Sequence, residues 1–83
     1  MIFQVQIKVM PLKDLLDPQG KAVLGGLHNL GMKGIQDVRV GKLISLQIEA
    51  SSETIAREIA ENASKQLLAN AVMEYFEIEF VKS

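Results

Sequence analysis

The chain has 83 residues, of which 48% are hydrophobic and only four are aromatic. Nine basic and ten acidic residues leave a formal net charge of −1, which argues against the basic surface expected of a nucleic-acid-binding protein. The chain contains no cysteine, so a disulfide framework, a thiol nucleophile and thiolate metal ligands are excluded.

The length predicts one domain, residues 1–83, because the composition does not change along the chain. A domain of this size buries roughly 60% of the surface of its unfolded chain, so its own core is marginal. Self-association would add buried surface, and we therefore expect a homo-oligomer. The chain has no cysteine and no segment typical of a signal peptide or a membrane span, which favours a cytoplasmic protein.

The first half of the sequence predicts a strand followed by a helix. Residues 2–9 alternate between apolar and polar side chains, as expected of a half-buried strand. A helix is predicted over residues 18–30, with Gly31 in the left-handed conformation that ends many helices. Gly25 and Gly26 weaken this helix by about 1 kcal/mol each relative to alanine. We expect them to allow close approach of a sheet or of a partner's backbone.

Residues 35–40 and 43–50 are predicted to form two strands of a hairpin around Gly41 and Lys42. A two-residue turn would place Val38 on the face opposite to that of Ile44, because side chains alternate along a strand. We therefore expect a three-residue connection or a bulge, which a left-handed glycine would allow. A tight turn would instead put apolar residues on both faces and favour a second interface on the sheet.

A second helix is predicted from Ser51-Ser52-Glu53, with a hydroxyl N-cap and an acidic first turn. Asn70 is the expected left-handed terminator, and residues 72–80 form the last strand. The predicted class is α+β with the element order βαββαβ. This is the ferredoxin-like arrangement, a four-stranded antiparallel sheet with two helices on one face. In this topology the start of the first helix, the hairpin and residues 68–71 lie at one end.

The sequence between the first strand and the first helix has the residue types of a backbone corner. Asp17 is an N-cap, and Pro18 suits the first helical position because it has no N–H to leave unpaired. The helix start, with Arg39 and Lys42 nearby, also offers a weaker interpretation as a phosphate or carboxylate site. A cap beside a solvated hairpin, or a protein contact, is favoured over the anion site, because the chain has no glycine-rich phosphate loop.

Residues suited to catalysis or metal binding are few. His28 is the single histidine and has no ligand set around it in the sequence, so we interpret it as a structural or interface residue. Asp14 and Asp17 resemble a carboxylate pair for acid–base chemistry, although a loop position and a cap explain them better. We therefore expect no catalytic, cofactor-binding or metal-binding residue in this chain.

Four segments together resemble the PurS family. They are Leu16-Asp17-Pro18-Gln19-Gly20-Lys21-Ala22-Val23, Leu27-His28-Asn29-Leu30-Gly31, Val38-Arg39-Val40-Gly41-Lys42 and Leu67-Leu68-Ala69-Asn70. PurS is the small subunit of phosphoribosylformylglycinamidine synthase, which converts formylglycinamide ribonucleotide to its amidine with glutamine and ATP. The resemblance implies a non-catalytic accessory subunit in purine biosynthesis. ATP and magnesium would then bind to the synthetase partner.

The resemblance also implies partners and contact residues. A PurS homodimer or homotetramer would bridge a synthetase subunit (PurL-like) and a glutaminase subunit (PurQ-like) and support ammonia transfer, without nucleic acid or membrane. The residues expected at that contact are Asp17, Pro18, Gln19, Gly20, Arg39, Gly41 and Lys42. The alternative is an amino-acid-binding regulatory domain, which shares the same element order. A selective ligand at 100 times its Kd would stabilise such a domain by about 2.7 kcal/mol.

Overall fold

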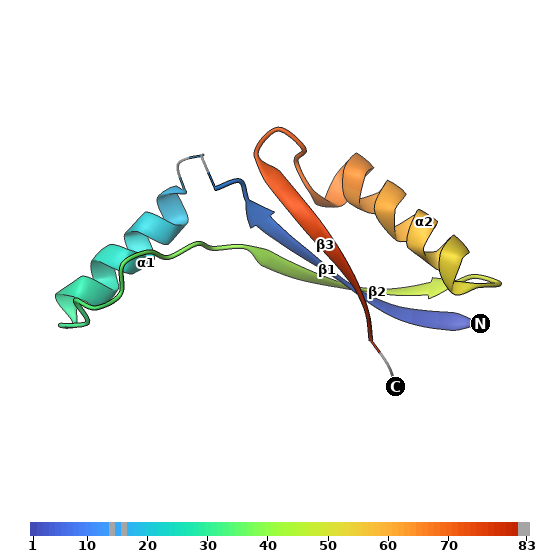
Figure 1. The fold of residues 1–83 in the computed structure, drawn as a ribbon, viewed down its shortest axis with the longest axis horizontal. Helices are drawn as coiled ribbons and strands as arrows, with labels where there is room; N and C mark the ends of the chain where they lie inside the picture. The colour runs from blue at the N-terminus through green and yellow to red at the C-terminus, as the bar shows by residue number, and fades with distance from the viewer. Residues whose placement is uncertain (14, 16, 82–83) are drawn as a thin grey trace.

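A computed structural model describes residues 1–13, 15 and 17–81 of the chain. The molecule is long and thin, with extents of 51 × 30 × 14 Å. Figure 1 shows two regions: a sheet covered by one helix, and a second helix that projects away from the sheet together with the segment that follows it. None of the helices in the described residues is long and apolar enough to cross a membrane.

The sheet has three antiparallel strands in the order β2-β1-β3. The central strand is β1 (Ile2–Pro11), flanked by β2 (Lys42–Glu49) and β3 (Glu74–Val81). The register pairs Ile7 with Ile44 on one side and with Ile78 on the other. Because directly opposed residues share a face, the alternation predicted from the sequence produces one apolar layer.

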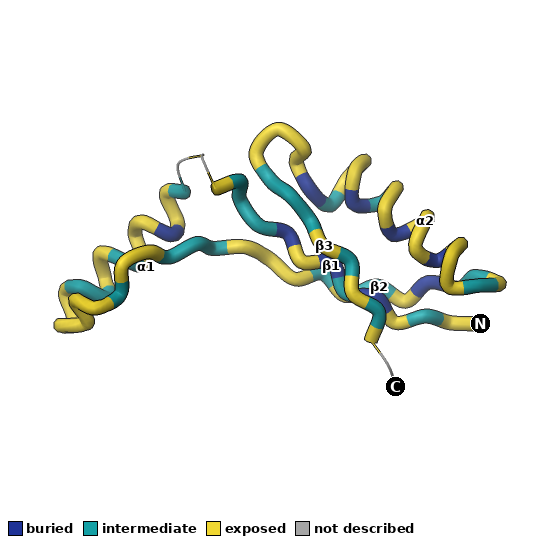
Figure 2. The backbone as a smooth tube through the Cα atoms, in the orientation of Figure 1, coloured by how far each residue is buried: buried dark blue, intermediate teal, exposed yellow. Residues whose placement is uncertain are grey.

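Helix α2 (Glu53–Ala63) covers this apolar layer. Ala56 and Ala60 are fully buried, so small side chains let the helix lie close to the sheet. The core beneath them consists of Val5, Ile7, Val9, Ile48 and Ala69, with partly buried residues such as Phe76 and Phe80 around it. Figure 2 shows that the buried positions are concentrated between α2 and the sheet.

Helix α2 starts with the predicted N-cap but does not end as predicted. The Ser52 hydroxyl accepts a hydrogen bond from the Ile55 amide at 3.3 Å, which confirms the predicted cap. The helix continues into a π-helical turn, η1 (Ser64–Leu68), where the Ala69 amide donates to the Ser64 carbonyl. Asn70 is not left-handed, since the only positive φ in the described residues belongs to a glycine. That prediction was wrong.

Helix α1 (Pro18–Asn29) begins at the predicted residue and ends one residue before the predicted end, with Leu30 as its C-cap. At its end Gly31 has a φ of 93°, and the Met32 amide donates to the Leu27 carbonyl at 3.1 Å. A second bond runs from the Gly31 amide to the His28 carbonyl at 3.0 Å. Together the two bonds form a Schellman motif, which satisfies carbonyls of the last helical turn. Figure 1 shows that α1 does not lie on the sheet.

Within the ferredoxin-like class that the sequence predicted, the expected four-stranded antiparallel sheet was wrong, because the described residues form a sheet of three strands. Residues 35–40 form no strand, and the chain does not turn back at Gly41 and Lys42. Instead it runs alongside α1 and continues directly into β2 (Figure 1). The cause is tertiary: residues 38–40 are fixed to the segment that joins β1 to α1, and this holds them away from the outer edge of β2.

Candidate functional site

Asp17 joins the start of α1 to the chain that returns from its far end. Its Oδ1 accepts a hydrogen bond from the Gly20 amide at 3.1 Å, and its Oδ2 accepts one from the Val40 amide at 2.9 Å. The first bond is the predicted N-cap, while the second spans 23 positions of sequence. One carboxylate therefore fixes the helix start and the segment before β2 at the same point.

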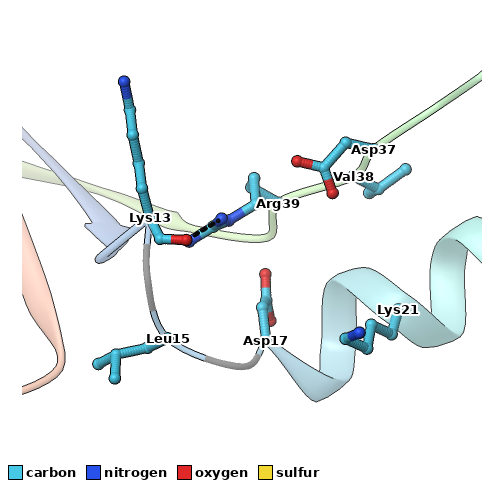
Figure 3. A pocket seen from close by; sticks show the side chains of 7 residues that line it. All are labelled: Lys13, Leu15, Asp17, Lys21, Asp37, Val38 and Arg39. Carbon is cyan, nitrogen blue, oxygen red and sulfur yellow. Dashed lines mark hydrogen bonds between the residues drawn. The ribbon is translucent and has the colours of Figure 1, made fainter.

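Arg39 fixes the same segment to the end of β1. Its guanidinium donates to the carbonyl of Lys13 at 3.1 Å, to that of Pro11 at 3.2 Å and, in a short contact, to that of Leu12. Figure 3 shows the bond to Lys13 crossing between the two segments. Arginine reaches these three carbonyls from two separate nitrogens of a planar fork, an arrangement that the single ammonium of lysine does not reproduce.

These contacts lower the pKa of Asp17. The amide of Val40 contributes most, followed by that of Gly20, because each donates to the charged form of the carboxylate. Burial acts in the opposite direction, and the positive charge of Arg39 adds a smaller lowering effect. The carboxylate is consequently ionised when it holds the corner together.

Glycine is required at position 20 because the backbone of the returning chain at Val38 passes very close to the start of α1. It is the buried residue of α1, and a Cβ added to it would lie 2.6 Å from Asp17 Oδ2 and 3.0 Å from the carbonyl carbon of Val38. The Val38 carbonyl oxygen would be closer still. The returning chain therefore covers the third helical position, whereas Pro18 and Gln19 before it are exposed.

A cavity of about 430 Å³ opens at this corner. Its lining comes from three segments, and the residues are Lys13, Leu15, Asp17, Lys21, Asp37, Val38 and Arg39. Figure 3 shows Asp17 directed toward the returning chain. The capping amide and the guanidinium already have partners within the chain, which favours a structural role for the corner over the anion site considered from the sequence.

The turn between α2 and β3 meets the same end of the molecule. The Leu12 amide donates to the Met73 carbonyl at 2.9 Å, which ties the end of β1 to this turn. Inside the turn, Asn70 Oδ1 accepts from the Val72 amide and Glu74 Oε1 accepts from the Asn70 amide. The end of β1 therefore meets both the returning segment and the turn before β3, although the hairpin predicted at this end does not form.

The residues predicted to contact a partner fall into two groups. Asp17, Gly20 and Arg39 are brought together and form the internal contacts described above. Pro18 and Gln19 are exposed on the first turn of α1. Gly41 and Lys42 lie farther along the chain, where it enters β2.

Gly41 and Lys42 form no turn. A Cβ on Gly41 would collide with the Met10 sulfur and the Val9 carbonyl oxygen, so the chain passes tightly over β1 at this point. Lys42 is exposed and pairs with Val9 as the first residue of β2. The glycine thus serves close packing rather than a hairpin.

Among the described residues, the side chains suited to catalysis or metal binding do not cluster into a reactive centre. The His28 Nε2 lies 2.8 Å from the Ile35 carbonyl oxygen and links α1 to the chain that returns along it. Asp14, half of the carboxylate pair considered from the sequence, lies outside the described residues. Among the described residues, no three histidine or acidic side chains are grouped to hold a metal ion.

Sequence reasoning missed the carbonyls that Arg39 binds. Pro11, Leu12 and Lys13 contribute backbone oxygens, so their side chains carry no signal of this role. Met10 lies beyond the strand predicted over residues 2–9, yet it belongs to β1 and lies against Gly41. Such contacts depend on the distance between segments and not on residue type.

The sequence matches known proteins over nearly its whole length. The family profile of PurS, described as phosphoribosylformylglycinamidine (FGAM) synthase, matches residues 4–82. The chain belongs to the PurS family. It is 38% identical to phosphoribosylformylglycinamidine synthase subunit PurS of Bacillus subtilis, over 94% of this chain and 92% of that protein. The PurS subunit of Synechocystis is 40% identical over 89% of this chain and 74% of its own length.

Solved PurS structures share the fold. A Bacillus subtilis PurS crystal form has a TM-score of 0.81 at 38% identity and covers 96% of this chain and 99% of that one. A chain in the structure of PurLQS from Thermotoga maritima has a TM-score of 0.90 at 30% identity, covering 98% and 99%. Because these alignments include residues 18–41, the projecting helix and its returning segment belong to the shared PurS fold.

Proposed function

We propose that this PurS chain is the non-catalytic subunit that joins a synthetase subunit to a glutaminase subunit in phosphoribosylformylglycinamidine synthase. In this role it supports the transfer of ammonia between the two partners, in the cytoplasm. ATP and magnesium act on the synthetase. The observation that supports the role most directly is the likeness to a chain of the Thermotoga maritima PurLQS structure.

The chemistry of the corner agrees with an assembly role. Asp17 and Arg39 are the charged groups that carry the longest-range hydrogen bonds at this end, and both are directed at backbone atoms of the same chain. They shape the surface without presenting a reactive group to a substrate. The exposed first turn of α1, at Pro18 and Gln19, then lies on a rigid support where a partner protein can contact it.

Reconstitution tests the role. Purified chain is added to a matching synthetase and glutaminase, and glutamine-dependent amidation of formylglycinamide ribonucleotide is measured. Activity with glutamine should require the chain, whereas activity with free ammonia should depend on it much less, because ammonia then needs no protected transfer. Glutamine-dependent activity that is equal with and without the chain would refute the proposal.

A surface variant locates the contact. Gln19→Arg should weaken assembly of the three components in gel filtration, because it places a long charged side chain on the exposed first turn. Glu58→Lys, on the exposed side of α2, is the matched control and should assemble normally. Charge reversal at Arg39 is unsuitable, since it would also release the carbonyls that this side chain holds. Normal assembly of Gln19→Arg would remove this turn from the contact.

The subunit also self-associates in this proposal, as a homodimer or a pair of homodimers. The small core supports this, because only seven hydrophobic side chains among the described residues are buried. Large apolar side chains remain exposed, including Leu30 at 74% and Leu43 at 59%. Sedimentation equilibrium of the isolated chain measures the state, and a monomer at micromolar concentration would contradict it.

A further inference from the structure

Strand β3 lies at an outer edge of the sheet, where it pairs with β1 on one side and with no described residue on the other. It has 8 residues, from Glu74 to Val81, and contains neither proline nor glycine. Its register with β1 is unbroken over its full length, so no bulge interrupts it. Every second residue of such an edge directs its amide and carbonyl away from the sheet. The edge is therefore open to a further strand.

Charge is the feature of β3 that limits what can pair with it. Natural proteins commonly protect an edge with proline, a bulge or a very short strand, and β3 has none of these. Glu77 and Glu79 are both exposed. They lie opposite Lys8 and Gln6, which alternate with buried residues of β1, so both glutamates are on the face of the sheet that α2 does not cover. The strand has no basic residue of its own.

These glutamates disfavour a second copy of this chain at the β3 edge. If β3 paired with itself about a two-fold axis, a register centred on Glu77, Ile78 or Glu79 would set glutamates of the two copies directly opposite each other. Like charges in that position destabilise a strand pair. Basic residues on the same face of an added strand would be attracted instead, so the charges select for a partner of a different sequence.

The apolar face of β3 is left partly open. Ile7 and Val9 of β1 are fully buried, whereas Ile78 and Phe76 opposite them are only partly buried. A hollow of about 270 Å³ lies between η1 and the start of β3, and its lining includes Ala69 and Phe76. An added strand with apolar residues on this face would extend the buried layer beyond β3.

We propose that an extended segment of the synthetase subunit adds to the outer edge of β3 as one further strand. The inference rests on the proposed function, and it names the surface that holds one of the two partners. Basic residues of the segment lie opposite Glu77 and Glu79 on the uncovered face. Its apolar residues lie beside Phe76 and Ile78 on the other face. Backbone hydrogen bonds supply the affinity, and the alternation of basic and apolar residues supplies the specificity.

Charge complementarity favours the synthetase over the glutaminase as the source of this strand. The synthetase binds ATP and a ribonucleotide, and phosphate groups are recognised by arginine and lysine. Glutamine, the substrate of the glutaminase, carries no net charge and requires no such excess of basic residues. The two exposed glutamates of β3 therefore suit a surface of the synthetase.

Hydrogen exchange of backbone amides tests the strand addition. The chain is exchanged in deuterated water alone, with each partner subunit and in the three-component complex, then quenched and read residue by residue. In the isolated chain one set of alternate β3 amides bonds to β1, and the other set faces solvent and exchanges fast. We expect the synthetase to slow the second set by about 100-fold or more, because these amides gain backbone acceptors. The glutaminase alone should leave them unchanged.

Charge variants give a second readout. Glu77→Gln with Glu79→Gln should raise the Kd for the synthetase by about 2-fold to 30-fold, as expected for the loss of two cross-strand charge pairs. Both positions are exposed, so circular dichroism should show an intact fold. Glu58→Gln with Glu61→Gln, on the exposed side of α2, removes the same charge and should leave the Kd unchanged. Equal Kd values for the two double variants would overturn the proposed charge pairing.

The exchange experiment has outcomes that separate this inference from the proposed function. Fast exchange of the second set of β3 amides in the complex would overturn the strand addition, even with the synthetase bound. Protection by the glutaminase alone, or in the isolated chain, would assign the edge to that subunit or to a second copy and would overturn it equally. Glutamine-dependent amidation is measured on the same samples. Activity that requires the chain leaves the proposed function intact in each of these cases.

Discussion

Replacing Gly20 with alanine tests whether the corner depends on the close approach of two backbones. The new Cβ would lie 2.6 Å from Asp17 Oδ2 and 3.0 Å from the Val38 carbonyl carbon, with the Val38 oxygen closer still. The returning chain must move by about 1 Å, which costs about 1–3 kcal/mol as for other overpacked sites. Loss of the Asp17–Val40 hydrogen bond adds about 1 kcal/mol, and the higher helix propensity of alanine offsets about 1 kcal/mol.

The expected net loss is about 1–3 kcal/mol, and thermal unfolding followed by circular dichroism measures it. Each kcal/mol shifts Tm by about 4–8 °C in a domain of this size. Gly25→Ala is the matched control, because a Cβ there meets nothing within 4 Å and should stabilise α1 by up to about 1 kcal/mol. Both variants are compared at one protein concentration, since association raises Tm. If Gly20→Ala matches the wild type while the control gains stability, the reasoning fails.

Three further predictions concern charged side chains. The lowered pKa of Asp17 contributes stability that is fully present well above the ordinary aspartate pKa of about 4 and is lost as the pH falls through the lowered pKa of the folded protein. Asp17→Asn should therefore reduce the fall of the urea midpoint on acidification, and an unchanged fall would contradict this. Arg39→Lys should lower the free energy of unfolding in urea by about 1.5–3 kcal/mol, because one ammonium does not reproduce the two separate guanidinium nitrogens that hold these carbonyls, and wild-type stability would refute that role. Arg57→Ala should cost about 0.5–1 kcal/mol by losing its contact with the Phe80 ring, while Arg57→Lys should recover part of the loss if the contact is cationic.

Local chemistry made several elements predictable from the sequence. Asp17 and Pro18 mark the start of α1 because a carboxylate cap and a missing N–H suit the first turn of any helix. Gly31 marks its end because only glycine enters the left-handed region without a steric cost. The alternation in β1 and β3 set the buried layer, since side chains on a strand change face at every residue.

The role of each corner residue was harder to predict. Arg39 was named from the sequence as a contact residue, but its partners are backbone oxygens, which leave no trace in residue identity. Gly20 was named from the sequence as a residue of the partner contact, and it is buried beneath the returning chain. The family resemblance grouped these residues as one predicted contact, and the structure shows that Asp17, Gly20 and Arg39 share one set of internal contacts.

Residues 35–42 show most clearly where prediction from the sequence stops. The sequence by itself determined that Val38 and Val40 favour extended backbone and that Gly41 carries no side chain. It did not determine whether the chain turns back at Gly41 or continues, because both paths place the same residues in extended conformation. Tertiary contacts decided the matter: Asp17 holds the Val40 amide, Arg39 holds the end of β1, and the close packing of Gly41 on β1 leads the chain straight into β2.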